Sequence, residues 1–207
     1  MTEYEGQPEE AAEIRTQYID WQLSTCERGD KVFFGSYPNT FHETIVNDIS
    51  WEVLKTEEAN GVKLVFLRAE KVFRGGAYHD KDEIVPWVQS TSCEWLNSVF
   101  YQNAFNAHEQ AMILPVTIDG ASLKLYIQSE KEMGKPSRVN AWGFTDENTY
   151  GERYFLRDDP VKRSISGICV KVVSADGKDV YQVDKITSPY LGMRPLVCVM
   201  IPTQQSN

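Results

Sequence analysis

The chain has no long apolar run: nowhere do its 207 residues approach the roughly 18 consecutive apolar residues that a membrane-spanning helix needs. Its first five residues include Glu3 and Glu5, where a secretory signal peptide would carry basic residues and then an apolar stretch. We therefore expect a cytoplasmic protein that does not associate with a membrane.

Clustered positive charge is also missing. The chain carries 21 Lys and Arg residues against 30 Asp and Glu residues, a formal net charge of −9, and Lys162-Arg163 is its only pair of adjacent basic residues. A phosphate backbone is bound by a concentrated positive surface, so we expect no nucleic-acid partner. The acidic balance leaves open an interaction protein of phage or mobile-element type, an inhibitor or assembly factor, that binds a basic protein surface.

Motifs for metal binding and nucleophilic catalysis are missing as well. The four cysteines show no C-x-x-C spacing, the three histidines form no H-E-x-x-H pattern, and no G-x-S-x-G occurs. We expect no cofactor and no metal, and we interpret the acidic pairs, such as Asp158-Asp159, as solvated loops rather than calcium sites. Cys169 and Cys198 lie in apolar, strand-like runs and are interpreted as buried thiols, with a disulfide between them as the alternative.

An N-terminal helix is indicated over residues 8–27. Pro8 suits a first helical position, and Gly29 is placed to end the helix. Its apolar residues recur at helical spacing and form one stripe: Ala11, Ile14, Tyr18 and Trp21. We expect this stripe to be the buried face, covering either the chain's own sheet or a second copy, so that a homodimer through this helix is an open alternative. Deleting residues 1–28 is then expected to lower thermal stability.

The rest of the chain predicts one core rich in aromatic rings, because 42% of the residues are hydrophobic and 5 Trp, 10 Tyr and 9 Phe are present. Patterns typical of strands cover residues 31–37, 49–55, 62–68, 123–128, 167–173, 179–186 and 195–201. Asn60-Gly61 predicts a left-handed hairpin turn. Short helices are expected after Thr91-Ser92, near residues 107–113, and after Ser129, whose capping-box partner would be Glu132.

Five aromatic cassettes follow one another in a fixed order. They are Phe34-Gly35-Ser36-Tyr37-Pro38, Ile49-Ser50-Trp51-Glu52-Val53-Leu54, Cys93-Glu94-Trp95-Leu96-Asn97 leading to Phe100 and Phe105, Phe155-Leu156-Arg157-Asp158-Asp159-Pro160, and Gly192-Met193-Arg194-Pro195-Leu196-Val197. In this order they resemble a bacterial family of unknown function with F-G-x-Y-P, I-x-W-x-V-L, W-L-N-x-x-F, L-R-x-x-G/P and G-V-R-P-A-L motifs. That family is similar to the C-type-lectin-like fold, which the formylglycine-generating sulfatase modifiers share in outline.

The resemblance implies an α+β fold with antiparallel sheets, two or three short helices and a long loop. It divides the chain into an N-terminal helical extension over residues 1–29, a C-type-lectin-like domain over 30–202 and a flexible tail over 203–207. The copper-binding cysteine pair of the sulfatase modifiers and the calcium-binding tripeptides of the sugar-binding lectins are missing here. Neither oxidase nor calcium-dependent lectin activity is therefore implied.

These features predict a non-enzymatic binding domain whose lectin-like scaffold presents residues 134–160 as a contact surface for a protein or small molecule. The expected ligand-binding residues are Tyr37, Trp142, Phe144, Tyr150, Arg157 and Arg194. The two arginines can instead clamp carbonyl groups of the long loop. An enzyme with a site built from His79, Asp80 and one arginine is the other alternative, although an exposed loop is the simpler interpretation of that segment.

Overall fold

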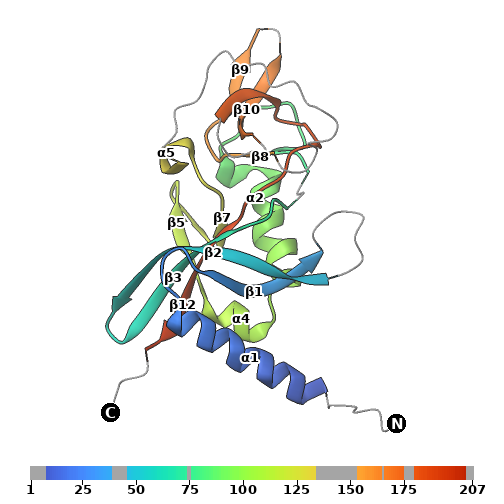
Figure 1. Ribbon diagram of the computed structural model, residues 1–207. Coiled ribbons are helices and arrows are strands. Elements are labelled where there is room, and N and C mark those ends of the chain that lie inside the picture. The colour runs from blue at the N-terminus through green and yellow to red at the C-terminus, as the bar shows by residue number, and fades with distance from the viewer. Residues whose placement is uncertain are drawn as a thin grey trace.

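The computed structural model describes residues 8–38, 46–73, 76–133, 153–164, 166–174 and 180–203 (Figure 1). These residues form a mixed α+β fold of antiparallel sheets and short helices, preceded by an N-terminal helix, which confirms the predicted fold class. Three of the predicted ligand-binding residues, Trp142, Phe144 and Tyr150, lie outside the described residues.

A curled six-stranded antiparallel sheet forms the centre of the fold. Its strands run in the order β1 (Lys31–Pro38), β2 (Val46–Ala59), β3 (Val62–Ala69), β12 (Leu196–Pro202) and β4 (Ile113–Leu114), and β7 (Leu125–Tyr126) also pairs with β12. The first three strands are the predicted meander. The C-terminal strand β12 then joins this meander to β4 and β7, so that the two ends of the sequence share one sheet.

The hairpin between β2 and β3 extends further than the pattern over residues 49–55 predicted. Pairing continues to Ala59 opposite Val62, and Asn60 and Gly61 turn the chain with φ of 53° and 75°. This pair of positive φ angles is the turn expected from Asn-Gly. Glutamate is a poor strand former by itself, but Glu57 and Glu58 continue the ladder opposite Leu64 and Lys63.

A second, smaller sheet lies at the opposite end of the molecule from the N-terminal helix (Figure 1). It contains β8 (Tyr154–Phe155), β9 (Val161–Arg163), β10 (Gly167–Val173) and β11 (Val180–Lys185). The pairing of β10 with β11 confirms the hairpin predicted from the two strands on either side of residues 174–178.

The strand predicted over residues 123–128 is interrupted. A two-stranded ribbon of β5 (Val116–Ile118) and β6 (Ala121–Leu123) ends at residue 123, and β7 begins at residue 125. The side chain of Asn97 accepts hydrogen bonds from the N–H groups of Lys124 and Leu125 at 2.9 and 3.0 Å. These two backbone groups are therefore satisfied by a helix residue instead of a neighbouring strand.

Short helical segments lie along the chain between β3 and β8. They are η1 (Trp87–Gln89), α2 (Thr91–Trp95), η2 (Leu96–Phe100), α3 (Tyr101–Ala104), α4 (Ala107–Met112) and α5 (Glu130–Met133). The cap of α2 is Ser90 rather than the predicted Thr91-Ser92, since the Ser90 hydroxyl accepts the Cys93 N–H at 3.1 Å. At α5 the predicted capping box is present, because Ser129 and Glu132 bond to each other's backbone N–H groups at 3.3 and 2.9 Å.

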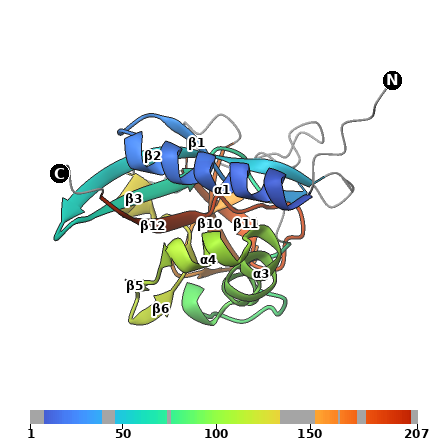
Figure 2. The same ribbon diagram turned by 90° about the horizontal axis from the view of Figure 1, so that it is seen from below.

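The N-terminal helix, α1 (Pro8–Thr25), lies along the free edge of β1 (Figure 2). The amide side chain of Gln22 bonds to both the N–H and the carbonyl of Phe33, at 3.1 and 3.5 Å. The Gly35 N–H donates to Glu109 at 2.9 Å, and the Gly35 carbonyl accepts from Arg15 at 3.5 Å. An open strand edge invites pairing with another chain, and here side chains of α1 and α4 occupy it.

The face of α1 that packs against the domain is not the predicted one. Ile19 and Leu23 are buried, whereas Ile14, Tyr18 and Trp21 of the predicted stripe are 61%, 49% and 59% exposed. The helix carries two apolar faces side by side, so spacing alone did not distinguish them. Gln22 decides which one packs, because its amide lies next to Ile19 and Leu23 and matches the free backbone groups of β1.

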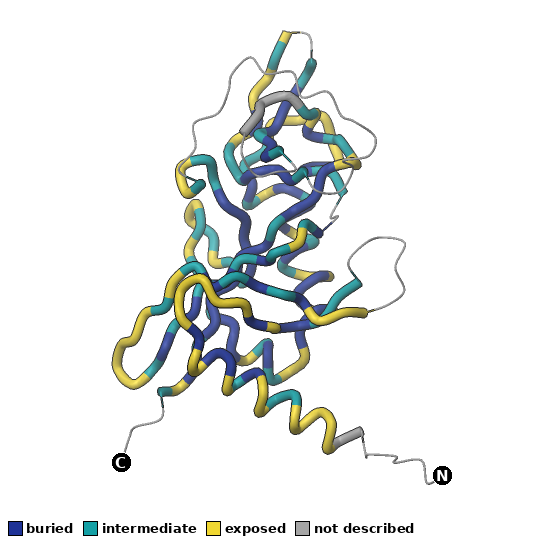
Figure 3. Tube along the Cα trace, in the orientation of Figure 1, coloured by how far each residue is buried: buried dark blue, intermediate teal, exposed yellow. Residues whose placement is uncertain are grey.

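The core runs without interruption from the main sheet to the second sheet, and exposed residues follow α1 and the tip of the β2–β3 hairpin (Figure 3). Its largest fully buried side chains include Trp51, Trp87 and Phe155. All four cysteines are buried and free, which confirms the interpretation as buried thiols and excludes the alternative disulfide. Burial raises the pKa of Cys93 and of Cys198 to about 11, which makes both poor nucleophiles.

Candidate binding site

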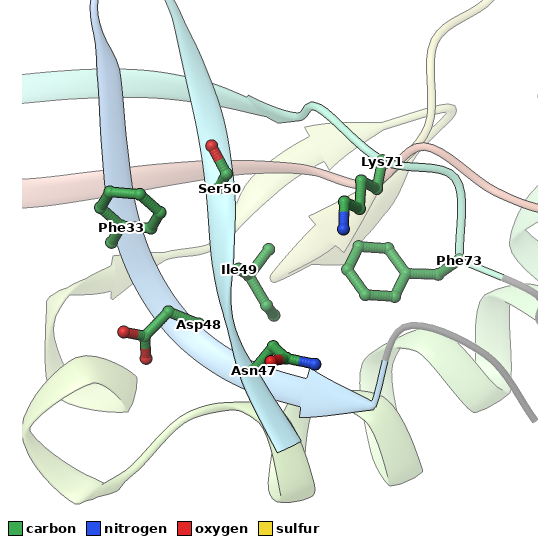
Figure 4. Close-up of a pocket in the computed structure, with 7 residues that line it drawn as sticks. All are labelled: Phe33, Asn47, Asp48, Ile49, Ser50, Lys71 and Phe73. Carbon is green, nitrogen blue, oxygen red and sulfur yellow. The ribbon is translucent and has the colours of Figure 1, made fainter. Parts of the chain in front are cut away.

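A pocket opens between the β1–β2 edge of the main sheet and the segment that follows β3. It has a volume of about 280 Å³ and is lined by Phe33, by residues 47–50 of β2, and by Lys71 and Phe73. Ile49 and Phe73 are each 3% exposed and provide an apolar floor, whereas Phe33 is 42% exposed. In the close-up, Lys71 and Phe73 extend to the side of β2 that carries Ile49 (Figure 4).

Lys71 brings an uncommitted positive charge to this pocket. Asp48 is occupied by Arg15 at 2.5 Å, and the Ser50 hydroxyl donates to Glu70 at 2.5 Å. Within the described residues, the Lys71 ammonium has neither a hydrogen bond nor an ion pair. An ammonium beside an apolar floor favours a ligand that carries a negative group on an apolar body.

Glu70 fixes the backbone next to Lys71. Its carboxylate lies 2.6 Å from the Lys31 ammonium and also accepts the hydrogen bond from Ser50. The hydrogen bonds from Lys31 and Ser50 hold the pKa of Glu70 below its usual range.

The substitution Glu70→Gln is expected to lower the free energy of unfolding by about 1 kcal/mol or less near neutral pH, because Lys31 is largely exposed. A carboxylate with a lowered pKa stabilises the folded state above its unfolded pKa, and this contribution is lost as the pH falls through the folded pKa. Melting temperatures should therefore differ between the two proteins at about pH 7, and the difference should disappear once the pH has fallen below the lowered pKa of Glu70. A difference that persists at low pH would contradict the role of the charge.

Tyr37, a predicted ligand-binding residue, is not among the residues that line the pocket, but its ring contacts Phe73, which is. Its ring centroid lies 6.2 Å from that of Phe73 and 4.8 Å from that of Phe100, and Tyr37 packs against the core. Burial raises the pKa of its hydroxyl group. The structure therefore gives Tyr37 a supporting position, and direct ligand contact stays a prediction.

Arg157 is engaged by the chain itself. Its guanidinium lies 3.0 Å from Asp119 and 2.5 Å from Glu132, and its side chain is 13% exposed. These pairs join α5, which precedes residues 134–152, to the turn of the β5–β6 ribbon. Arg157 thus holds two carboxylates of the chain itself, whereas the carbonyl groups of the long loop, which the sequence suggested as its partners, lie outside the described residues.

A second ion cluster lies beside Arg157. The Lys171 ammonium on β10 pairs with Glu130 and lies 3.2 Å from Asp158. Burial lowers the pKa of Lys171, but the two carboxylates outweigh it, so the pKa is raised overall. Asp158 also accepts the N–H of Glu130 at 2.7 Å, so it is part of an internal network and not the solvated loop predicted from sequence.

Arg194 holds the segment that carries the pocket lysine. Its Nε donates to the Ala69 carbonyl at 3.0 Å, and its guanidinium lies 5.5 Å from the centre of the Tyr154 ring. Ala69 in turn donates its N–H to the Pro195 carbonyl at 2.9 Å. The arginine therefore acts on the pocket through the backbone, and contact with a ligand stays a prediction.

His79 does not lie on an exposed loop, as the glycines and acidic residues around it predicted. It is 6% exposed; its Nδ1 accepts the N–H of Thr91 at 3.3 Å, and its Nε2 lies 3.2 Å from Glu83. Asp80 lies 3.7 Å from Nδ1. Neither Arg157 nor Arg194 is among its contacts in the described chain, so the constellation that an enzyme site would need is not assembled.

Two general expectations concern metals and membranes. Over the described ranges, no three His, Cys, Asp or Glu side chains are grouped so that they could hold a metal ion. None of the helices formed by these residues is both long enough and apolar enough to cross a membrane.

The last cassette of the sequence packs against the backbone of Phe73, one of the residues that line the pocket. Met193 and Phe73 exchange both backbone hydrogen bonds, at 2.7 and 2.8 Å. A Cβ atom on Gly192 would lie 2.2 Å from Val72 and 2.8 Å from the Phe73 carbonyl, so only glycine fits this contact. The cassette thus holds the backbone on both sides of Lys71.

Residues 60–201, which include this cassette, match the family described as a domain of unknown function, DUF6273. The chain belongs to this family. The DUF6273 region begins at the tip of the β2–β3 hairpin and ends in β12, and it therefore excludes α1, β1 and β2. No curated protein and no solved structure matches the chain. The resemblance to C-type-lectin-like folds is therefore not confirmed.

The pocket draws on both parts of the chain. Lys71 and Phe73 belong to the DUF6273 region, whereas Phe33 and Ile49 precede it. Sequence reasoning missed all four as site residues. A signal existed for Phe33, because it alternates with Val32 and Phe34, and two buried neighbours on a strand require an outward side chain between them.

Proposed function

We propose that this DUF6273 chain is a non-enzymatic binding domain whose pocket takes a small carboxylate on an apolar body. The observation that carries the proposal is the uncommitted ammonium of Lys71 beside the apolar floor of Ile49 and Phe73. The lectin-like character of the scaffold, and a contact surface over residues 134–160, belong to the same proposal and rest on the sequence resemblance.

The size of the pocket limits the ligand. Small-molecule sites usually enclose about 300–1,000 Å³, and this one, at about 280 Å³, lies just below that range. A single aromatic ring or short aliphatic chain with one carboxylate fits such a volume. Phe33 offers exposed ring surface on which the apolar body can pack, and the charge of Lys71 gives specificity for the anion.

The Lys71 ammonium can select for an anionic ligand because the acidic groups near it are already paired within the chain. Asp48 would repel an anion if it were free, but Arg15 neutralises it at 2.5 Å. Glu70 is likewise held by Lys31 and Ser50. A neutral ligand of the same shape would therefore lose the interaction with Lys71 and gain no new partner.

The two alternative functions have less support. The enzyme alternative lacks geometry, since His79 contacts Glu83 and the Thr91 backbone rather than an arginine. An acidic interaction protein rests on the net charge of −9 alone, and the acidic residues next to the pocket, Asp48 and Glu70, are paired internally.

Calorimetry or NMR titration with phenylacetate and with its neutral isostere phenylacetamide tests the proposal. We expect phenylacetate to bind the full chain with a dissociation constant of about 1 mM or less and phenylacetamide to bind about tenfold more weakly. The variant Lys71→Met should reduce phenylacetate binding to the level of the amide. NMR shifts should concentrate on Phe33, Ile49 and Phe73.

Lys162→Met is the matched control, because Lys162 is an exposed lysine on β9, far from the pocket in sequence and in another sheet. It should leave phenylacetate binding unchanged. Equal binding of the acid and the amide, no binding of either, or equal loss in the two lysine variants would refute the proposed site.

A further inference from the structure

A second pocket lies on the smaller sheet, at the end of the molecule opposite α1 (Figure 1), and it shares no lining residue with the pocket of Lys71. Its volume of about 530 Å³ falls within the range of about 300–1,000 Å³ that is usual for small-molecule sites. One wall comes from the turn between β9 and β10, and the other from the end of β11 and the segment after it. The lining residues include Ser166, Asp184, Lys185, Thr187, Ser188 and Tyr190.

The backbone of this second pocket is held by the core. Ile186 lies in the middle of the lining segment and is fully buried. Its N–H donates to the Ile168 carbonyl at 2.9 Å, and its carbonyl accepts the N–H of His79 at 3.2 Å. The Ser188 N–H closes a tight turn on the Lys185 carbonyl at 2.9 Å. The side chains on both sides of Ile186 therefore extend from a fixed backbone, which lowers the entropic cost of binding a ligand.

Lys185 gives the second pocket an uncommitted positive charge. The carboxylate of Asp184, which also lines the pocket, is paired with Arg153. Over the part of the chain that the structure describes, the Lys185 ammonium has neither a hydrogen bond nor an ion pair. Two further charged residues near this end of the β10–β11 ladder, Asp82 and Arg163, are of opposite sign. The charge of Lys185 is therefore not balanced by these neighbours, and the pocket favours an anion.

The other polar groups of the second pocket suit a phosphate rather than a carboxylate. Ser166, Thr187 and Ser188 supply three hydroxyl groups, none of which is engaged in a hydrogen bond within the described ranges. A phosphate monoester has three terminal oxygens that accept from these hydroxyls and from an ammonium, whereas a carboxylate has only two. The Tyr190 ring lines the same pocket and is 59% exposed, next to the buried Leu191. An exposed ring in this position offers a surface on which a flat ring of the ligand stacks.

We infer that the second pocket binds a phosphate monoester carried on a flat ring, the chemistry that a nucleoside monophosphate represents. The phosphate group contacts Lys185 and the hydroxyl groups, and the ring stacks on Tyr190. A volume of about 530 Å³ is more than a phosphate group alone needs, which leaves room for the ring. A single phosphate does not require the concentrated positive surface of a nucleic-acid partner, so dispersed basic residues are compatible with this ligand.

Titration of the full chain with adenosine monophosphate, adenosine and inorganic phosphate, followed by NMR or calorimetry, tests this inference. We expect adenosine monophosphate to bind with a dissociation constant of about 1 mM or less, and the other two compounds to bind about tenfold more weakly. Lys185→Met should reduce the binding of adenosine monophosphate to the level of adenosine, because the charge that holds the phosphate is lost. Tyr190→Ala should reduce it to the level of inorganic phosphate, because the stacking surface is lost.

Lys131→Met on α5 and Tyr18→Ala on α1 are the matched controls, because both side chains are exposed and neither lines the second pocket. They should leave the binding of adenosine monophosphate unchanged. All four substituted side chains are exposed, so each variant should keep the wild-type melting temperature. The inference is overturned if none of the three compounds binds, if adenosine or inorganic phosphate binds as tightly as adenosine monophosphate, or if the control variants lose as much affinity as Lys185→Met and Tyr190→Ala. None of these outcomes depends on carboxylate binding at Lys71.

Discussion

Replacing Gly35 by alanine is expected to lower the free energy of unfolding by about 3 kcal/mol or more. Gly35 has a φ of +74°, and a Cβ atom there would lie 2.6 Å from the Phe105 ring and 2.8 Å from the Ala104 carbonyl. The neighbours cannot yield easily, because Phe105 is a buried core ring and Ala104 contributes backbone. The strain of a left-handed alanine therefore adds to overpacking of the core.

The variant Gly29→Ala separates these two causes. Gly29 has a φ of +94°, but a Cβ atom there would meet nothing within 4 Å. The Gly29→Ala variant should lower the free energy of unfolding only by the strain of a left-handed alanine, on the order of 1 kcal/mol. Urea denaturation of both variants measures the difference, and equal losses for Gly29→Ala and Gly35→Ala would show that the contact with Phe105 contributes nothing.

Deleting residues 1–28 is expected to leave little or no folded protein at 37 °C. Burial of Ile19 and Leu23 alone contributes about 3–6 kcal/mol, a large part of the roughly 5–15 kcal/mol that stabilises a typical domain. The deletion also removes the Ser24 and Cys26 carbonyls that accept from the buried Lys63 ammonium at 2.9 and 2.7 Å. Both effects lower the free energy of unfolding.

Two point variants show which face of α1 carries this effect. Leu23→Ala should cost about 2–5 kcal/mol, since Leu23 is 0% exposed, whereas Ile14→Ala should change stability by no more than about 0.5 kcal/mol, since Ile14 is 61% exposed. Thermal denaturation of the two variants makes the comparison. The reverse order of effects would mean that the stripe predicted from sequence is the packed face after all.

The docking of α1 also extends the domain beyond the residues that match DUF6273. The match covers residues 60–201, yet the free edge of β1 is covered by Gln22 and Arg15 of α1, and Lys63 within the match caps the end of α1. The last cassette also has a packing role, since Gly192 and Arg194 position the backbone on either side of Lys71. The residues of this last cassette are thus explained by packing, and the pocket lies where the matched and unmatched parts of the chain meet.

The sequence by itself determined the features that depend on neighbouring residues. Asn60-Gly61 fixed the hairpin turn because the two residues tolerate positive φ, and Ser129 with Glu132 fixed the start of α5 because their side chains reach each other's backbone. Alternation of apolar and polar residues located the strands of the central meander. The absence of metal-binding and nucleophile motifs and the dispersed basic residues gave expectations about metals, cofactors and nucleic acid, and these stay predictions.

Only the tertiary structure decided which of two apolar faces of α1 is buried, because the choice depends on a match between Gln22 and a strand edge around residue 33. It also decided that Arg157 and Arg194 serve the chain's own groups and that His79 is buried, since their partners lie tens of residues away or in the turn of another helix. The pocket likewise depends on residues that are distant in sequence. Phe33, Ile49 and Lys71 come together through strand pairing and through the Met193–Phe73 contact, and a local pattern records none of these distances.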